Sequence, residues 1–595
     1  MCGIFYKSNF HSKTDEKLFI KACDLLNHRG PDDYGYLFTK NHSFGHKRLA
    51  IRDVYNAKQP MSILNNHLIY NGEIYNNLEL EKKLNEKLEF NSDTLLLLKL
   101  LMRYSEDILK DLNGIFSFVY THNDDVLIVR DMFGVKPLYY TFVEDDIIVA
   151  SEIKSILEYT DKRVVDREGL CELLGMGPSH SVGKTVYKDI YELPPGHYLK
   201  CVNGKKFEEH VYYELTAKEF PYTYDETKRR VRSLLDKAIK RQMISDVDLS
   251  TFLSGGLDSS IISTVVALNK KKLDTYSISY EDSKFKANAF ERSLDADFTH
   301  LVSDAIKSNQ HDIVIDNKSL VEGLKTAVHL KDSPGMTDID SSMHFLALNI
   351  SLKHKVSLSG ECADEVFGGY PWFYEKTKKL TTFPWIRNLD YKESLLSPKY
   401  REKLHLKEYV MEEFEKAIKA TPVLPNDSKT TIRQRQLSYI NMKYFMTNLL
   451  DRKDRMTMGA SIEVRVPFCD KDLVDFLYNV PFKFKYRSKV EKKLLRDAYS
   501  DVVVKEVIER KKSPYPKSNS LVYHNEVVKL LRQALEDKNS ILYELFDITK
   551  INEIMDSSEE LEVPWYGQLM RKTAFLAYLY QIDYWFKKYN IRIEE

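Results

Sequence analysis

The sequence of 595 residues is 43% hydrophobic and 30% charged, which is typical of a soluble globular protein, and its length predicts about two to four domains. Lysine plus arginine and aspartate plus glutamate number 88 each, so the charge balance indicates neither a nucleic-acid nor a membrane partner. The six cysteines form no CxxC pair, which argues against a disulfide framework or a zinc cluster. No secretory signal and no apolar stretch of bilayer length is visible, so we expect a cytoplasmic protein.

Residues 1–212 are predicted to form an α+β sandwich. Short β-rich segments with glycine and asparagine between them are typical of strands joined by turns, and only a few helical stretches interrupt them. A turn at Leu193–Gly196 precedes a last predicted strand pair. The other predicted strands are Asn41–Arg52, Leu68–Tyr70, Ile115–His122, Val126–Arg130 and Ile147–Ala150, and the predicted helices lie near Asp15–Leu26 and Asp93–Tyr104.

A linker is predicted over residues 213–224, and the pattern changes beyond it. Strands then alternate with helices, which indicates a parallel, doubly wound α/β sheet in a second domain over residues 225–595. From about Phe373 the sequence is largely helical and charged, and it predicts a helical C-terminal region without a further sheet. The predicted order at the start of this domain is helix Asp225–Met243, strand Leu249–Ser254, helix Ser259–Leu268 and strand Thr275–Tyr280.

The chain begins Met1-Cys2, and removal of Met1 would place a thiol and a free α-amine on one residue. An α-amine titrates near pH ~7.7–8.0, so part of it is unprotonated at cellular pH and can serve as the base that a thiol nucleophile needs. Any residue can follow Met, so Cys2 alone is weak evidence for catalysis.

Stronger evidence is an ordered series of motifs in the same half of the chain. The series is Asn27–Asp32, Gly45–Ile51, Tyr70–Asn76, Asn91–Asp93, Arg130–Tyr140 and Ala150–Lys154. It resembles the class II (N-terminal nucleophile) glutamine amidotransferases over most of residues 1–200. The resemblance implies that residues 1–212 form a glutaminase domain with the N-terminal nucleophile sandwich fold.

The resemblance also implies roles for the matching positions. Cys2 would attack the glutamine side-chain amide, and the Asn71 side chain and the Gly72 backbone N–H would form the oxyanion hole. Arg48 would hold the α-carboxylate of glutamine through its planar fork, and Asp93 would receive the α-ammonium. The implied glutamine-binding residues are Arg48, Asn71, Gly72, Glu73 and Asp93.

Two features of this half have another interpretation or depart from the family. Asn71–Gly72 by itself could be a type I′ turn. After Asp93 many relatives carry Thr-Glu-Val, whereas this chain has Thr94–Leu96, so we expect changed helix packing and an intact glutaminase.

A glycine- and serine-rich loop, Ser254–Ser260, lies between a predicted strand and a predicted helix. Small residues let the backbone approach a phosphate chain, and the helix N-terminus presents N–H groups to the anion. The GxxxxGK[ST] spacing of a Walker loop is absent. The loop resembles the pyrophosphate loop of the N-type ATP pyrophosphatases, which cleave ATP to AMP and pyrophosphate; the alternative is a simple helix cap.

Three further segments carry recognisable motifs. They are Ser357–Tyr370, Asp451–Phe468 and Lys492–Arg496. They resemble the asparagine synthetases, so the resemblance covers nearly the whole chain. It implies that Asp258 and Asp364 bind Mg²⁺ and that Glu361 is a general base in catalysis. The implied ATP-binding residues are Leu253, Ser254, Gly256, Asp258, Ser259, Ile278, Ser359, Gly360 and Lys492.

Two positions differ from the usual asparagine synthetase pattern. Cys362 stands where the commonest relatives have glycine, and we expect a small core residue with an ordinary backbone conformation. The segment Lys331–Ser342 is also unusual and is expected to line the acceptor side of the site.

The resemblance implies a reaction in two stages with ATP and Mg²⁺ as cofactors. Glutamine would be hydrolysed at Cys2 to ammonia, aspartate would become β-aspartyl-AMP with release of pyrophosphate, and ammonia would convert the adenylate to asparagine. The nearest alternative is another carboxylate acceptor, such as the diaminopimelate side chain of a cell-wall precursor. The retained Cys2 disfavours a β-lactam synthetase, the pyrophosphate loop disfavours a phosphoribosyl amidotransferase, and the intact set of site residues disfavours a non-catalytic relative. Small molecules (glutamine, aspartate and ATP) are the expected partners, with a homodimer left open.

Overall fold

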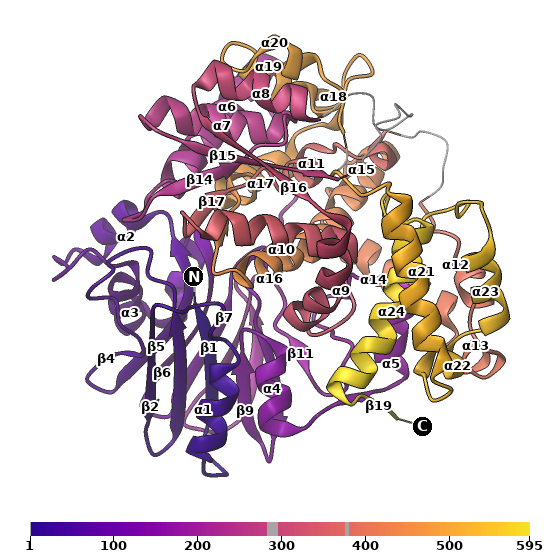
Figure 1. Cartoon of the computed structure of the whole chain (residues 1–595). Coiled ribbons are helices and arrows are strands. Elements are labelled where there is room, and N and C mark those ends of the chain that lie inside the picture. The colour runs from indigo at the N-terminus through magenta and orange to yellow at the C-terminus, as the bar shows by residue number, and fades with distance from the viewer. Residues whose placement is uncertain (1, 282–294, 375–379, 514, 595) are drawn as a thin grey trace.

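The computed structural model describes residues 2–281, 295–374, 380–513 and 515–594, and its first half is a sandwich of two six-stranded antiparallel sheets (Figure 1). The first sheet has the order β11 (Tyr191–Glu192), β8 (Tyr139–Val143), β9 (Asp146–Ala150), β1 (Gly3–Ser8), β3 (His42–Arg48) and β2 (Asp33–Phe38). The second has the order β13 (Phe207–Val211), β12 (His197–Cys201), β7 (Asp125–Arg130), β6 (Gly114–His122), β5 (Asn66–Ile74) and β4 (Met61–Ile63). Ile4 and Ile69 share the core between the sheets, whereas Phe5 packs in another core, because successive side chains of a strand point to opposite faces.

Two pairs of helices accompany the sandwich. They are α1 (Glu16–Asp24) with α4 (Ile153–Thr160) on the first sheet, and α2 (Asn77–Leu84) with α3 (Asp93–Tyr104) on the second. Helix α3 begins after Ser92, whose hydroxyl accepts a hydrogen bond from the Leu95 backbone N–H. Leu95 and Leu96, which follow Asp93 in place of the usual residues, are buried in the apolar core beneath this sheet. The predicted α+β sandwich is confirmed.

The second half contains a five-stranded parallel sheet with helices on both faces (Figure 1). Its strands, in spatial order, are β16 (Asn309–Ile315), β15 (Asp274–Tyr280), β14 (Leu249–Phe252), β17 (Val356–Leu358) and β18 (Glu463–Arg465). One face carries α6 (Tyr224–Gln242), α7 (Leu257–Asn269) and α8 (Asp295–Ile306), and the other carries α9 (Asn317–Lys331), α10 (Asp338–Ser351) and α16 (Met446–Met458). The predicted doubly wound parallel sheet is therefore confirmed.

The prediction that no further sheet follows Phe373 is wrong, and one more strand of the parallel sheet also lies beyond that residue. Strand β18 completes the parallel sheet, and β19 (Arg592–Ile593) pairs in parallel with β10 (Val164–Val165) to form a separate two-stranded sheet. Both strands are too short to show the alternation of apolar and polar residues from which strands are recognised. The tertiary pairing, not the local pattern, makes them strands.

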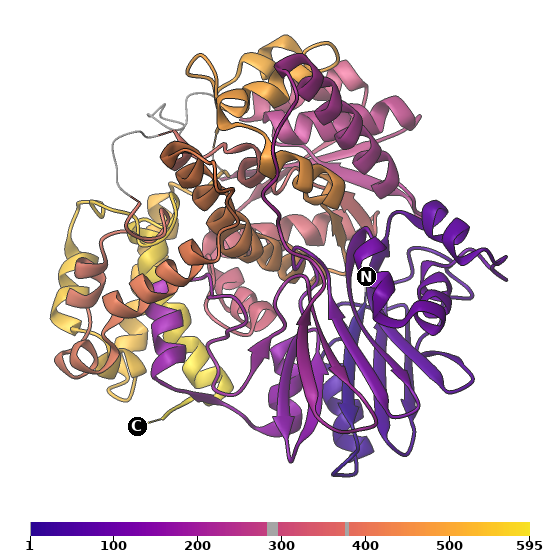
Figure 2. The same cartoon turned by 180° about the vertical axis from the view of Figure 1, so that it is seen from behind.

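The two halves share apolar core. Residues of α5 (Arg167–Cys171) and the π-helical segment Glu172–Met176 belong to the same buried cluster as α24 (Lys572–Tyr589), and Tyr578 on α24 donates a 2.7 Å hydrogen bond to the Leu173 carbonyl. Figures 1 and 2 both place α5 among the C-terminal helices. The predicted linker contains a stretch without helix or strand, residues 213–223. Within the described ranges, no helix is both long and apolar enough to cross a membrane.

Candidate active sites

Cys2 lies immediately before β1 and is almost fully buried, with 7% of its surface exposed. Burial raises the pKa of its thiol, and the Leu49 backbone N–H and the Arg48 guanidinium offset part of that rise. A thiol in this environment needs a base before it can act as a nucleophile. The predicted base, the α-amine of Cys2, depends on removal of Met1, which lies outside the described residues.

Asn71 and Gly72 lie inside β5, so the interpretation of this pair as a turn is wrong. The Cys2 backbone N–H donates to Asn71 Oδ1 at 3.0 Å, whereas Asn71 Nδ2 has a long 3.5 Å contact with Ser117 Oγ. The Asn71 amide is thus anchored through its oxygen, and its NH₂ group keeps donor capacity for a developing oxyanion. A Cβ atom at Gly72 would lie 2.2 Å from the Ile115 carbonyl oxygen, so a side chain does not fit there.

Arg48 ends β3 beside Cys2, but part of its guanidinium is already engaged. Nη1 donates to the Val54 carbonyl at 2.8 Å, and Nη2 donates to the Asp53 carbonyl at 2.7 Å and, more weakly, to that of Arg52. An arginine has five N–H donors, so Nε and one Nη1 hydrogen are left for a substrate carboxylate. The structure is compatible with the predicted clamp on glutamine, and it shows in addition that the loop after β3 holds the clamp in place.

Glu73 and Asp93 form a buried acidic corner near the end of β5. Tyr70 donates a 2.9 Å hydrogen bond to Asp93, while Arg52 and Arg465 approach the Glu73 carboxylate at 3.6 and 3.4 Å. Burial, followed by the charge of Asp93, raises the pKa of Glu73 to about 8. The proximity of these two carboxyls is what an α-ammonium site requires. Arg465, which contacts Glu73, belongs to the second half of the chain.

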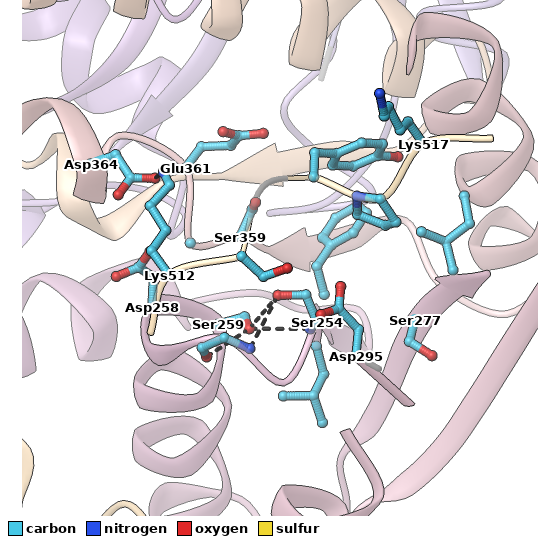
Figure 3. A pocket seen from close by; sticks show the side chains of 18 of the residues that line it. Ser254, Asp258, Ser259, Ser277, Asp295, Ser359, Glu361, Asp364, Lys512 and Lys517 are labelled. Atoms are coloured by element: carbon cyan, nitrogen blue, oxygen red, sulfur yellow. Dashed lines mark hydrogen bonds and ion pairs between the residues drawn. The ribbon is translucent and has the colours of Figure 1, made fainter. Parts of the chain in front are cut away.

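The phosphate loop joins β14 to α7, at the carboxyl edge of the parallel sheet where nucleotide sites of this architecture lie. Ser254 and Ser259 hydroxyls are 3.0 Å apart, and Ser259 Oγ also accepts the Ser254 backbone N–H at 3.1 Å, as the dashed lines in Figure 3 show. Gly255 has φ +66°, and a Cβ there would lie 2.6 Å from Phe298 Cβ. The loop is therefore closed on itself, with the N-terminus of α7 open toward the cavity.

A second loop follows β17, the neighbour of β14, and brings Ser359 and Gly360 beside the phosphate loop. A Cβ at Gly360 would lie 3.0 Å from Asp258 Cβ, which shows how closely the two loops approach. Cys362 at its end is buried in the core, as predicted, but its φ of +73° contradicts the predicted ordinary backbone conformation. The sharp turn from β17 into α11 (Ala363–Phe367) imposes this left-handed conformation, which glycine adopts more easily.

Asp258 and Asp364 meet at one end of the cavity, held together by lysines (Figure 3). Lys492 Nζ lies 2.6 Å from Asp258 Oδ2 and 2.5 Å from Asp364 Oδ1, and Lys512 forms an ion pair with Asp364 Oδ2. Burial and the nearby Asp364 raise the pKa of Asp258. The two lysines outweigh burial at Asp364 and hold its pKa below the usual range.

These carboxylates fit a Mg²⁺ site that a nucleotide completes. Asp258 Oδ1 is buried without a hydrogen-bond partner, so one oxygen is available to a cation. Among the described residues no cluster of three or more histidine, cysteine or acidic side chains could hold a metal by itself. Mg²⁺ usually takes one or two carboxylates together with phosphates and waters, and two carboxylates at a phosphate loop match that donor set.

Glu361 lies in the same cavity between two cations. Its Oε1 accepts from Arg452 Nη2 at 3.2 Å and is 3.3 Å from Lys453 Nζ. Lys453 and Arg452 outweigh burial and lower the pKa of Glu361. The carboxylate is thus ionised, and as a base it would accept a proton only when these ion pairs loosen.

All the predicted ATP-site residues, Glu361 and Asp364 line one cavity of about 470 Å³. Figure 3 shows Asp364 and Lys512 at one end of the cavity and Lys517 at the other. The cavity continues beyond the phosphate loop between aromatic and aliphatic side chains, namely Trp372, Phe445, Leu449 and Leu569. Of the segment Lys331–Ser342, expected to line the acceptor side, Met336 is among the lining residues, while Asp338 and Asp340 are buried at the start of α10.

Three cations of this site were not predicted from the sequence. Arg452 and Lys453 lie in a recognised motif but were given no role, and Lys512 lies in a segment that resembles nothing specific. Lys512 also stacks 4.1 Å from the Tyr370 ring centroid. A basic run at 510–512, together with the need to balance phosphate charge, is the signal that could have identified Lys512.

Comparisons with known proteins match two family models to the two halves of the chain. A model of the glutamine amidotransferase domain matches residues 1–213, and a model of asparagine synthase matches residues 230–587. Asparagine synthetase [glutamine-hydrolyzing] 3 of Bacillus subtilis is 40% identical over the full length of both chains. Asparagine synthetase [glutamine-hydrolyzing] 1 of the same organism is 29% identical over 91% of each chain. Amidase chry2 of Gibberella zeae is 25% identical over 87% of this chain and 88% of its own.

The asparagine synthase model covers more than half of the chain, and the full-length identity of 40% is independent of it. The amidotransferase model accounts for the sandwich that carries Cys2. The chain therefore belongs to the asparagine synthase family of amide-forming ligases, in the form that carries an N-terminal glutamine amidotransferase domain.

Proposed function

We propose that this chain is a glutamine-hydrolysing asparagine synthetase that uses ATP and Mg²⁺. The observation that carries the proposal is that the phosphate loop, the carboxylates of Asp258 and Asp364, and Glu361 line the same cavity. The same chain also carries a buried cysteine, Cys2, at its start. Family membership supports the reaction class, and the relatives named asparagine synthetase support aspartate as the acceptor.

In the first half, Cys2 attacks the side-chain amide of glutamine, and its α-amine accepts the thiol proton once Met1 is removed. Asn71 Nδ2 and the Gly72 N–H stabilise the tetrahedral oxyanion, while Arg48 and the Glu73–Asp93 corner hold the α-groups of glutamine. Ammonia leaves, and water then releases glutamate from the thioester.

In the second half, the aspartate β-carboxylate attacks the α-phosphate of ATP and pyrophosphate leaves. Ser254, Ser259 and the N-terminus of α7 receive the phosphate chain. Asp258 and Asp364 would hold Mg²⁺, which when bound would neutralise part of the phosphate charge. Lys492 and Lys512 form ion pairs with the two carboxylates in this structure, and their ammonium groups are close enough to the phosphate loop to bind the leaving pyrophosphate.

Glu361 acts after adenylation. Ammonia attacks the acyl carbon and acquires a positive charge that must be lost as a proton before or while AMP departs. The Glu361 carboxylate accepts that proton, and Arg452 and Lys453 keep it ionised until then. This order requires that the ion pairs loosen when the adenylate fills the cavity.

A second candidate function is amidation of a larger carboxylate. The lining of the cavity includes the apolar side chains Met336, Trp372, Phe445 and Leu569, which suit contact with an acceptor larger than aspartate. A relative that is similar over 87% of this chain is named an amidase, which is compatible with a different acceptor in this family.

A panel of carboxylate acceptors separates the two functions. Pyrophosphate release is measured with ATP, Mg²⁺ and either glutamine or ammonium chloride, for aspartate, glutamate and a diaminopimelate-containing peptide. We expect release with aspartate from both nitrogen sources, and loss of the glutamine-supported amide in Cys2→Ala with the ammonium-supported rate retained. Release with the peptide and none with aspartate would replace the first function by the second.

A further inference from the structure

A chain of buried contacts joins the residue that carries the nucleophile to the second half of the molecule. Arg29 is fully buried, and its Nε donates to the Cys2 carbonyl at 3.1 Å. Its Nη1 donates to Glu152 at 2.8 Å and its Nη2 donates to Asp454 Oδ2 at 2.7 Å. The guanidinium therefore connects the backbone of Cys2 with a carboxylate that lies 425 residues after Arg29 in the sequence.

Asp454 belongs to α16, the helix that also contacts Glu361. Arg452 and Lys453 of this helix hold the Glu361 carboxylate at 3.2 and 3.3 Å, and Asp454, the next residue, points to the other half. Lys136 of the first half donates to the second oxygen of Asp454 at 2.9 Å. One helix thus touches both candidate sites through adjacent residues.

The Asp454 carboxylate is well suited to fix Arg29. It is 4% exposed, and Arg29 and Lys136 outweigh burial and hold its pKa below the usual range, so it is ionised. A planar guanidinium with three buried partners has one orientation in which all three are satisfied. Without Asp454 the guanidinium keeps only the contacts with Glu152 and Cys2, and the position of the Cys2 carbonyl is less tightly fixed.

We propose that Asp454 is a positioning residue for glutamine hydrolysis, which acts through Arg29 on the backbone of Cys2. This inference rests on the proposed function, because it presupposes that Cys2 hydrolyses glutamine. It means that the second half supplies a residue on which the geometry of the first site depends. The alternative is that Asp454 only contributes to stability, as a buried ion pair between two packed halves does.

Asp454→Asn tests the inference because it keeps the shape of the side chain and removes the charge. Asp451→Asn is the matched control: Asp451 lies on the same helix, accepts a 3.3 Å hydrogen bond from Tyr139 of the first half, and has no contact with Arg29 among those described. Glutamate release, ammonia-dependent asparagine formation and the thermal midpoint are measured for both variants. Asp454→Glu, which restores the charge, is measured in parallel.

For Asp454→Asn we expect the kcat of glutamine hydrolysis to fall about ten- to a hundredfold, because a displaced nucleophile reacts slowly even when substrate is bound. The KM for glutamine should change less than about twofold, since Arg48, Glu73 and Asp93 are untouched. Ammonia-dependent synthesis should stay within about twofold, and Asp451→Asn should leave hydrolysis unchanged. Asp454→Glu should recover part of the lost kcat.

Two results would overturn the inference. One is normal glutamine hydrolysis in Asp454→Asn. The other is that Asp454→Asn also loses ammonia-dependent synthesis and thermal stability, and that Asp454→Glu restores both to the same extent as it restores hydrolysis. That result would show a purely structural role for Asp454. If the wild-type protein itself releases no glutamate from glutamine, the proposed function fails and not the positioning role of Asp454.

Discussion

Lys512 and Lys492 both reach the Asp364 carboxylate, but they hold it from different segments. Lys492 precedes α19 (Lys493–Tyr499) in a motif that is recognisable in the sequence, whereas Lys512 lies in an irregular segment whose backbone N–H donates to Glu491 at 3.1 Å. The two lysine charges balance those of the two carboxylates, Asp258 and Asp364. When a cation takes the carboxylates, both ammonium groups become available to phosphate oxygens.

Replacing Lys512 by methionine should therefore impair the ATP-dependent step alone. We expect aspartate-dependent pyrophosphate release to fall about tenfold, since one charge-assisted contact to the leaving group is lost. Glutamate release from glutamine should be unchanged. Lys505→Met, in an exposed ion pair on α20 (Lys505–Glu509), is the control and should behave as wild type. A wild-type rate in Lys512→Met would remove Lys512 from the site.

At the scale of elements, the segment Glu172–Met176 forms a π-helical turn whose first residue is fully buried. Glu172 accepts hydrogen bonds from the Ser181 backbone N–H at 2.8 Å and from Tyr409 on α14 (Leu406–Lys419) at 2.5 Å. Burial raises its pKa from 4.5 to about 7. This carboxyl connects the end of the first half to a helix of the second through hydrogen bonds. Near neutral pH a part of the Glu172 population is protonated and therefore uncharged.

The raised pKa of Glu172 makes the protein less stable as the pH rises. Between pH 4.5 and about 7 the folded protein keeps a proton on Glu172 that the unfolded chain has released, so this group lowers the free energy of unfolding as the pH rises. Glu172→Gln removes the titration. Relative to wild type, its free energy of unfolding should increase by on the order of 2 kcal/mol between pH 5 and pH 8, because only the wild-type protein loses stability over that range. Urea denaturation at both pH values measures this, and a difference that does not change with pH would contradict the assignment.

The elements that the sequence predicted are those in which the local pattern and the tertiary contacts agree. The leucines of α3 repeat with helical spacing and follow a capping serine, and β14 and β15 contain the β-branched and aromatic residues that strands favour. Strand β18 was missed because three residues give no period. The conformation of Cys362 was missed because a cysteine rarely adopts positive φ, and only the tight turn between β17 and α11 requires it.

In the candidate sites, too, residues within a local motif could be predicted, whereas residues brought in by tertiary contacts could not. Residues in contiguous motifs, such as Ser254–Ser259 and Glu361–Asp364, could be identified from the chain alone, and the structure places them in one cavity. Lys512 and Arg465 could not, because each reaches its partner from a distant segment. Contacts of this kind depend on how the elements pack, which a single sequence does not encode in any local pattern.

For the molecule as a whole, the shared core predicts that the halves unfold together. One apolar cluster contains Phe5 of the first strand and Trp585 of the last helix, so neither half buries its side of that cluster alone. All four tryptophans, residues 372, 385, 565 and 585, lie in the second half, whereas Cys2 reports on the first. Tryptophan fluorescence therefore reports the unfolding of the second half, and glutaminase activity reports the unfolding of the first.

A variant confined to the first half tests this cooperativity. Leu98 is fully buried in a cluster made only of residues from the sandwich and its helices. Leu98→Ala should destabilise by about 2–5 kcal/mol through the cavity that it leaves. We expect it to lower the urea midpoint of tryptophan fluorescence and that of glutaminase activity by equal amounts. A shift in the glutaminase midpoint with unchanged fluorescence would show two independent units.

The buried charges between the halves also bear on how such a chain can change over generations. Arg29, Lys136 and Glu152 on one side meet Asp454 and Arg455 on the other, and each is at most 4% exposed. A recombinant that joined this first half to a second half lacking Asp454 would bury Lys136 without this ion pair and leave Arg29 with Glu152 alone, which costs more than losing an apolar contact of the same size. We therefore expect an exchange of halves between relatives to give a stable protein only when the residues on both sides of this charged contact are kept.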